Sequence, residues 1–300
     1  MLHGLALLPL ASLPACAGNP RGLPAGSGGK PAVSTLTLMA EGARQVDVTI
    51  CEPATPVAGT ILFSHGAGSA PDKYPGMIDT WAAAGWRVLA PLHVDSREHP
   101  RNAEFTGLAS WRTRIEDMRL LSQHIGDTPY IAAGHSYGGL VALTLGGAAA
   151  IPPEGIDDPL SDPKVSAVVA FSPPAPIPVL ITQEGYGKIA VPALIQTGTA
   201  DFIPGSDPAD GNAWRGHLAP FDAAVPGGHR YALVLEGVDH YFGGAICDYS
   251  QPGPPRPDQL DKAVDIADRF MRGFGLNDAQ ARAALNAELS GDLPVMLMQR

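Results

Sequence analysis

The sequence predicts an α/β fold, with a mostly parallel, doubly wound central sheet that carries helices on both faces. The prediction rests on short β-branched or apolar runs along the chain and on the helical patterns that separate several of them. The predicted strands are residues 46–50, 60–64, 87–91, 130–133, 165–171, 193–196 and 231–235. In such a sheet we expect functional groups at the carboxyl ends of the strands.

Three segments are predicted as helices. In residues 111–125 apolar side chains recur every three or four positions, and Arg114, Glu116 and Arg119 are expected on the polar face. A second helix is expected from Pro257 to about Met271, with Gly273 as its stop signal. The Ala-rich residues 277–289 are predicted as a third helix, capped by Asn277 or Asp278.

Composition limits the domain count and the class of partner. The chain has 300 residues, of which 45% are hydrophobic and 17% charged, as in a globular protein. No change in composition divides it, so residues 34–300 are predicted to form one domain. Only about 20 residues separate the strand that ends near Phe171 from the one that starts at Pro192, which leaves no room for a large lid domain. The formal net charge of −10 leaves no basic surface for nucleic acid.

The first 17 residues are apolar and are predicted to be a signal peptide, or a lipoprotein signal peptide in which Cys16 is acylated. No Lys or Arg precedes Arg21, which departs from the usual charged start of such a segment. Residues 18–33 are then a flexible leader. The expected location is periplasmic, secreted or lipid-anchored, with membrane contact only through Cys16. The location is cytoplasmic if this segment is not a signal.

Two cysteines remain after such processing, Cys51 and Cys247. A pair in an exported protein suggests a disulfide. Because one cysteine lies on an early strand and the other follows the last predicted strand, we expect them to be far apart and unbridged.

Residues 134–138 read Gly-His-Ser-Tyr-Gly, between the predicted strand at 130–133 and an apolar, helix-like run that starts at Leu140. A G-x-S-x-G turn in this context is a nucleophile elbow, which exposes the Ser136 hydroxyl at the start of a helix. Glycines flank the turn because side chains there would collide with neighbouring backbone.

A serine hydroxyl needs a base and a group that orients the base. In the fold that uses this elbow, the acid follows the serine and the histidine comes last, each after a later strand. Asp201 follows the predicted strand 193–196, and His240 follows the strand 231–235. We therefore assign Asp201 as the acid and His240 as the base. The competing acids are Asp207, Asp210 and Glu184, which lie away from a strand end.

Seven other histidines are assigned structural or peripheral places. They are His65 and His135, expected to brace loops, His93 and His99 on a loop after an earlier strand, His124 in a helix, and His217 and His229 in or beside a helical insertion.

Two backbone amides are candidates for binding a negatively charged oxygen. Tyr137 N–H lies at the helix start after Ser136, and Ala67 N–H lies in the Gly-rich bend after the strand 60–64. Gly68 or Ser69 could donate in place of Ala67.

These motifs together resemble the α/β-hydrolase superfamily over most of residues 45–275. Within it the chain looks most like the serine-nucleophile branch of the group that contains dienelactone hydrolases, platelet-activating-factor acetylhydrolases and cutinase-like polyester hydrolases. Dienelactone hydrolases proper use cysteine where this chain has Ser136. The resemblance implies hydrolysis of a small-molecule or polymeric ester, without a cofactor or metal.

Two other functions remain open from the sequence. Amide or peptide hydrolysis would use the same Ser136, His240 and Asp201. A non-catalytic binding protein could also retain the fold as a scaffold.

Overall fold

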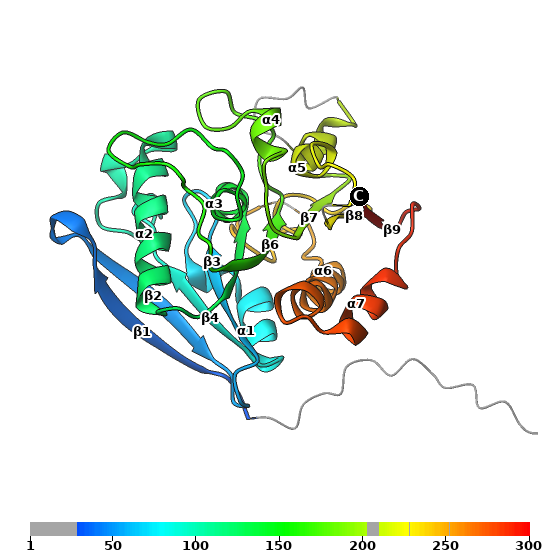
Figure 1. The fold of residues 1–300 in the computed structure, drawn as a ribbon, viewed down its shortest axis with the longest axis horizontal. Helices are drawn as coiled ribbons and strands as arrows, with labels where there is room; N and C mark the ends of the chain where they lie inside the picture. The colour runs from blue at the N-terminus through cyan, green and yellow to red at the C-terminus, as the bar shows by residue number, and fades with distance from the viewer. Residues whose placement is uncertain (1–28, 203–209, 228, 252) are drawn as a thin grey trace, which may run out of the picture.

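A nine-stranded sheet runs through the centre of the molecule (Figure 1), in the order β1-β2-β4-β3-β5-β6-β7-β8-β9. The computed structural model describes residues 29–202, 210–227, 229–251 and 253–300. The strands are β1 Ala32–Met39, β2 Gln45–Glu52, β3 Gly59–Ser64, β4 Trp86–Pro91, β5 Tyr130–His135, β6 Val165–Phe171, β7 Ala193–Gly198, β8 Arg230–Leu235 and β9 Val295–Gln299.

The strands from β4 through β3 to β8 are parallel to their neighbours, whereas β1, β2 and β9 pair antiparallel at the two edges. The predicted mostly parallel sheet is therefore confirmed. The chain goes from β3 to β4 on one side and then crosses to β5 on the other side, so the strand order reverses at β3. Ligand sites in open parallel sheets lie at such a reversal, beyond the carboxyl ends of the strands.

Helices cover both faces of the sheet, as predicted. They are α1 Pro75–Ala83, α2 Trp111–His124, α3 Tyr137–Leu145, α4 Gln183–Tyr186, α5 Ala219–Asp222, α6 Pro257–Phe270 and α7 Ala279–Asn286. Short 3-10 segments are η1 Glu41–Ala43, η2 Pro71–Lys73, η3 Asn102–Glu104, η4 Gly107–Ser110 and η5 Ala213–Leu218, and η6 Met271–Gly275 is a π-helical turn.

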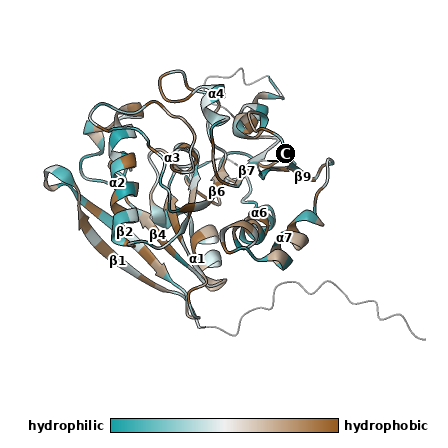
Figure 2. Cartoon of the chain, in the orientation of Figure 1, coloured by the Kyte–Doolittle hydropathy of each residue, from teal (hydrophilic) through white to brown (hydrophobic). Residues whose placement is uncertain are grey.

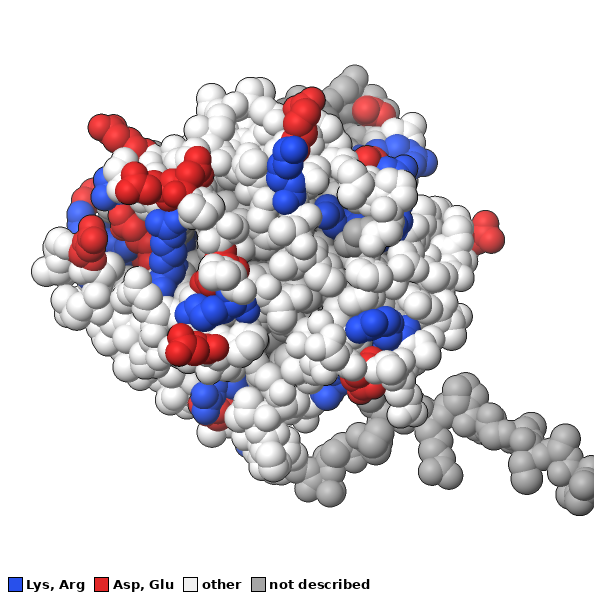
Figure 3. Space-filling model, in the orientation of Figure 1, with Lys and Arg blue, Asp and Glu red and all other residues white. Residues whose placement is uncertain are grey.

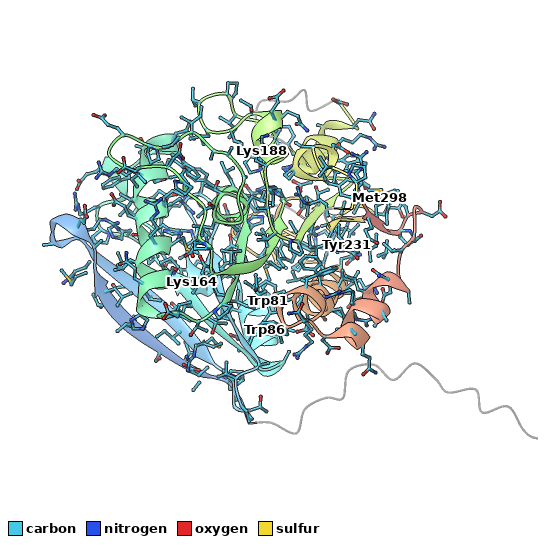
Figure 4. The ribbon with its side chains drawn as sticks, viewed as in Figure 1. Trp81, Trp86, Lys164, Lys188, Tyr231 and Met298 are labelled. Carbon is cyan, nitrogen blue, oxygen red and sulfur yellow. The ribbon has the colours of Figure 1, made fainter. Side chains whose placement is uncertain are left out.

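The core has two layers because side chains alternate along each strand. In β3, Leu62 packs in the layer under α2 and α3, whereas Ile61 and Phe63 pack in the layer under α1 and α6. Trp81 of α1 and Trp86 of β4 belong to this second layer (Figure 4), and the Trp86 indole donates to Asp268 of α6 at 2.7 Å. Apolar colour follows the inner strands, while α2 carries both apolar and polar positions (Figure 2).

Helix α2 confirms the predicted segment, but its polar face differs from the prediction. Arg114, expected on the solvent side with Glu116 and Arg119, is completely buried. Its spacing, three residues after Trp111 and four before Met118, puts it on the same helix face as the apolar stripe, so its charge and not the periodicity led to the wrong placement. On that face the guanidinium reaches the carboxyl end of β3, where it donates to Ser64 and to the carbonyls of His65 and Gly66.

The last helices differ little from the prediction. Helix α6 ends at Phe270, but the chain continues through the π-helical turn past Gly273, which is therefore not a stop. Asp278 is the cap of α7, since its side chain accepts from the N–H groups of Gln280 and Ala281.

The two cysteines of the described residues, Cys51 and Cys247, are buried and unbridged, as expected. The predicted signal segment and Cys16 lie outside the described residues, and β1 begins at Ala32, inside the range predicted as leader. No described helix is long and apolar enough to span a membrane. On the face drawn in Figure 3, basic and acidic side chains are interspersed and separated by uncharged surface.

Candidate functional site

Ser136 lies on the tight turn between β5 and α3, at the carboxyl edge of the sheet. Its backbone has φ 55° and ψ −121°, a conformation that costs a non-glycine residue on the order of 1–3 kcal/mol. The surrounding fold holds it there, because its N–H donates to the carbonyl of Phe171 at 2.8 Å. The side chain of Ser136 therefore projects at the predicted elbow, directly before the first turn of α3.

Glycine is required on both sides of the elbow. A Cβ atom at Gly138 would lie 1.9 Å from the carbonyl oxygen of Ser64, and one at Gly134 would lie 2.2 Å from that of Gly138. Both contacts are with backbone, which cannot move aside without disturbing β3 or α3. The glycines let strand and helix approach closely enough to form the turn.

Asp201 and His240 meet at the ends of β7 and β8. Nδ1 of His240 lies 2.8 Å from Oδ1 of Asp201 and donates to it. The other carboxylate oxygen accepts from the hydroxyls of Ser172, at 2.5 Å, and Thr197, at 2.8 Å. Because Asp201 orients the His240 ring through Nδ1, the other ring nitrogen, Nε2, is the one that can accept a proton from another group.

The carboxyl of Asp201 is ionised in the fold. Burial raises its pKa, but the adjacent His240 and the hydrogen bonds to the carboxylate outweigh burial and hold the pKa far below its usual range. Of the competing acids, Glu184 and Asp210 are exposed, and Asp207 lies outside the described residues.

Ser136 and His240 line one cavity of about 320 Å³ at this edge of the sheet. Both residues with candidate oxyanion amides, Ala67 and Tyr137, line it too. The remaining lining residues are Gly107, Leu108, Ser172, Pro174, Ala175, Pro176, Ile177 and His217. The structure thus brings four of the five predicted site residues to one cavity, and the fifth, Asp201, contacts His240 from behind.

The Gly-rich bend after β3 is held from the inside by Arg114. The guanidinium donates to the carbonyls of His65, at 2.7 Å, and Gly66, at 3.2 Å, and pairs with Asp95 at 2.9 Å. A carbonyl and the next N–H belong to one peptide plane and point in opposite directions. Holding the Gly66 carbonyl toward the interior therefore directs the Ala67 N–H outward, where Ala67 lines the cavity.

Tyr137 is fixed by the same arginine. Its ring lies 4.8 Å from the Arg114 guanidinium carbon and stacks on Trp111 with a centroid distance of 5.9 Å. The N–H of Tyr137 is at the first position of α3, where helical N–H groups have no partner inside the helix. Two amides from separate elements are thus available beside Ser136.

The pair of Arg114 and Asp95 makes a stability prediction. Arg114→Met would leave the largely buried Asp95 carboxylate without its cation, which costs about 3–5 kcal/mol of unfolding free energy. Urea unfolding measures it, with Arg112→Met as the matched control because Arg112 is exposed on the same helix. The control should lose less than about 1 kcal/mol. Equal losses in the two variants would contradict the assigned role of Arg114.

The sequence profile of the family described as alpha/beta hydrolase family matches residues 61–295, which is more than half of the chain. The chain belongs to the α/β-hydrolase family. A search of curated protein sequences found no significant match.

Solved α/β-hydrolase structures share the fold at low sequence identity. The esterase domain of a Rhodothermus marinus protein aligns with a TM-score of 0.54 at 16% identity, covering 81% of this chain and 99% of that one. Native esterase 2 of Thermogutta terrifontis gives 0.55 at 18% identity, covering 80% and 91%. An alpha-beta serine hydrolase homologue from Coxiella burnetii gives 0.53 at 15% identity, covering 77% and 95%.

A histidine that the sequence did not single out also reaches the site of this α/β-hydrolase. His217, on η5, lines the cavity and places Nε2 3.0 Å from Oδ1 of Asp201. It was interpreted as part of a helical insertion because its position follows no strand. No local pattern in the sequence indicates that η5 folds back over the end of β7.

His135, next to Ser136 in the sequence, joins the loops around the site. One ring nitrogen lies 2.9 Å from the backbone carbonyl of His240, and the other lies 3.0 Å from the hydroxyl of Tyr74. The Tyr74 oxygen in turn accepts from the N–H of Gly66 at 2.9 Å. Burial lowers the pKa of His135 to about 3, so its neutral ring braces the loop that carries His240 and the Gly-rich bend.

A second hydrogen-bonded set of Ser, His and Asp side chains lies inside this α/β-hydrolase. His93 contacts Ser64 Oγ at 2.9 Å and Asp117 at 2.7 Å, and all three side chains are buried. Arg114 donates to Ser64, so Ser64 donates onward to the ring. Because these three side chains are buried and a substrate cannot reach them, we interpret their hydrogen bonds as support for the edge of the sheet and not as a second site.

Asp201, His217 and His240 offer ligand atoms within 4.8 Å of one another, a spacing that could hold a metal ion. However, one ring nitrogen of each histidine lies within 3.0 Å of the same Oδ1 atom of Asp201, and two hydroxyls donate to the other oxygen. The two histidines therefore surround one carboxylate and are not directed at a shared open position where an ion could bind.

Proposed function

We propose that this α/β-hydrolase is a serine carboxylesterase that works through an acyl-enzyme. The observation that carries the proposal is the meeting of Ser136, on its strained elbow, with the His240 and Asp201 pair at one cavity. A serine with a base and an oriented carboxylate is the arrangement that activates a hydroxyl for acyl transfer. We place the chain in the serine-nucleophile branch of the family.

In the first half of the reaction, the Ser136 oxygen attacks the ester carbonyl carbon, and Nε2 of His240 accepts the serine proton. The tetrahedral intermediate then expels the alcohol oxygen, which takes that proton from His240. In the second half, water attacks the acyl-enzyme and gives its proton to His240, and the carboxylic acid leaves as Ser136 is reprotonated. Asp201 remains ionised throughout and holds the His240 ring in the orientation and tautomer that accept the serine proton.

The negative charge of the intermediate lies on the former carbonyl oxygen. We assign its donors as the amides of Ala67 and Tyr137, which come from the Gly-rich bend and the start of α3. Donors that are already in place cost no reorganisation during the reaction, and each is worth about 3–4 kcal/mol in acyl transfer. The Arg114 contacts that hold the bend and pack on Tyr137 support this assignment.

The named neighbours are consistent with the proposal. Thermogutta terrifontis esterase 2 has been solved with propionate bound and also phosphorylated by paraoxon. At 18% identity this likeness shows only the fold. The proposal of an esterase function for this chain therefore depends on its own Ser136, His240 and Asp201.

The cavity limits the acyl group. At about 320 Å³ it is near the lower end of the range for small-molecule sites, and apolar side chains such as Leu108, Pro174 and Ile177 line it. An uncharged, short acyl chain fits this lining, whereas a carboxylate would lose hydration against it.

A panel of p-nitrophenyl esters from acetate to palmitate tests the function. We expect the highest kcat/KM with acyl chains of two to six carbons and a fall of at least about tenfold at twelve or more, since the longer chain outgrows the cavity. An aminoacyl p-nitroanilide in the same assay tests amide hydrolysis. Faster turnover of the anilide than of every ester, or a folded protein inactive on the whole panel, would contradict the proposal.

A further inference from the structure

His217 contacts a hydrogen-bond acceptor with each of its two ring nitrogens. Nδ1 lies 2.7 Å from the backbone carbonyl oxygen of Pro173, and Nε2 lies 3.0 Å from Oδ1 of Asp201. The Nε2 contact does not have the direction of a hydrogen bond, and it is an ion pair if the ring is protonated. The His217 side chain is 2% exposed, and the His217 ring centre is 5.7 Å from that of His240.

A neutral imidazole cannot satisfy both contacts. It carries one N–H, which the Pro173 carbonyl requires at Nδ1, and the lone pair of Nε2 would then face the carboxylate oxygen of Asp201. Two electron-rich atoms at 3.0 Å repel each other, whereas a protonated Nε2 is attracted. The two acceptors therefore favour the doubly protonated, cationic ring.

Moving the proton onto Asp201 does not remove the conflict. Its Oδ1 already accepts from His240, and its Oδ2 accepts from the hydroxyls of Ser172 and Thr197. A carboxylate surrounded by donors is stabilised in its ionised form. Burial lowers the pKa of His217, but the contacts to Asp201 and Pro173 outweigh burial and raise the pKa above its ordinary value.

We propose that His217 is a cationic second partner of Asp201, a positioning residue that shares the carboxylate with His240 and opposes protonation of the His240 ring. The proposal rests on the esterase function and names a regulatory feature of the same site. Asp201 then balances one permanent cation and retains less attraction for a second one on His240. Because His240 must be unprotonated to accept the serine proton, the cation extends activity toward lower pH.

The titratable groups around His217 come from several elements. Among the described residues, Asp201 follows β7, His240 follows β8 and the neutral His135 ends β5. On its own element, Arg215 lies over the Trp214 ring at 4.5 Å. Near His240 the further groups are Asp239, whose carboxylate accepts from the N–H groups of Tyr241 and Gly243, and the phenol of Tyr241.

The variant His217→Gln removes the charge and keeps a polar side chain. We expect the acidic limb of the kcat/KM profile to move to higher pH by about one unit. This is the shift expected when a nearby, partly buried positive charge is removed. The exposed His124→Gln is the matched control and should leave the limb in place. A merely structural role would lower activity at all pH values without moving the limb, and an unmoved limb in an active His217→Gln overturns the proposal.

The protonation state is measured directly in the wild-type protein by ¹⁵N NMR of the histidine rings at pH 7.5. Both ring nitrogens of His217 should carry protons. The signals are assigned by connecting the ring to the backbone of the residue in the wild-type protein. The measurement therefore does not depend on a variant that could be unstable. An unprotonated Nε2 overturns the proposal. This readout needs no catalysis, so absence of esterase activity with a cationic His217 would contradict only the proposed function.

Discussion

Replacing Ser136 with alanine should lower kcat/KM for a short-chain p-nitrophenyl ester by at least about 10⁴-fold, because the acyl-enzyme can no longer form. The loss should be in kcat, while the fold is retained, since alanine fits the space of the serine. Residual hydrolysis above the buffer rate would come from the amides that polarise the carbonyl.

The control for this variant is Ser34→Ala, on the exposed edge strand β1. It should keep wild-type kcat and KM. Circular dichroism and urea unfolding of both variants establish that the fold is intact. A Ser136→Ala protein that keeps more than about a tenth of wild-type activity would remove Ser136 from the mechanism.

Replacing Asp201 with asparagine should lower kcat by about 10³–10⁴-fold at pH 7.5. The carboxylate accepts from His240 Nδ1 and from two hydroxyls, and it also faces His217. Asparagine offers one oxygen and an NH₂ group that faces donors, so the His240 ring loses its partner or adopts the tautomer that cannot accept the serine proton. Burial makes these mismatched donors costly for stability as well.

The measurement for Asp201→Asn is steady-state kinetics from pH 6 to 9, together with urea unfolding. The exposed Asp210→Asn, on the loop between β7 and η5, is the control, and it should change kcat by less than about twofold. If Asp201→Asn keeps kcat and Asp210→Asn loses it, the acid has been assigned to the wrong residue.

Local chemistry in the sequence was sufficient to locate much of the candidate site. The elbow at Ser136 has a short pattern with a steric reason for each glycine, and Asp201 and His240 both come directly after a predicted strand. In a parallel sheet, strand ends converge, so chain order and strand position together place these groups. The bend at Ala67 is found in the same way.

The partners of the site could not be predicted in this way. Arg114 lies on the same face of α2 as the apolar stripe, three residues after Trp111 and four before Met118, but nothing in the sequence indicates the buried acceptors that it meets at the Gly-rich bend and at Asp95. His217 reaches Asp201 across a contact between segments that no sequence spacing encodes. The buried partners of a polar side chain depend on the whole fold, whereas periodicity reports only which face of a helix is packed.

The same limit applies to the edges of the sheet. Strand β1 pairs antiparallel at one edge and is mostly exposed, and its polar and apolar residues are mixed, so it lacks the continuous apolar run that marked the inner strands. Strand β9 is apolar from Val295 to Met298 but was not predicted, because four apolar residues do not by themselves indicate a strand. The inner strands were predicted because burial on both faces requires nearly continuous apolar residues.

The central claim is that Ser136 is a nucleophile activated by His240. Its most direct test is reaction of the purified protein with a fluorophosphonate, followed by intact mass and peptide mapping. The account predicts one phosphonyl group per chain, located on Ser136, with Ser136→Ala unlabelled and His240→Ala labelled at least about a hundredfold more slowly. Absence of labelling in the folded wild type, or equal labelling of Ser136→Ala, would contradict it.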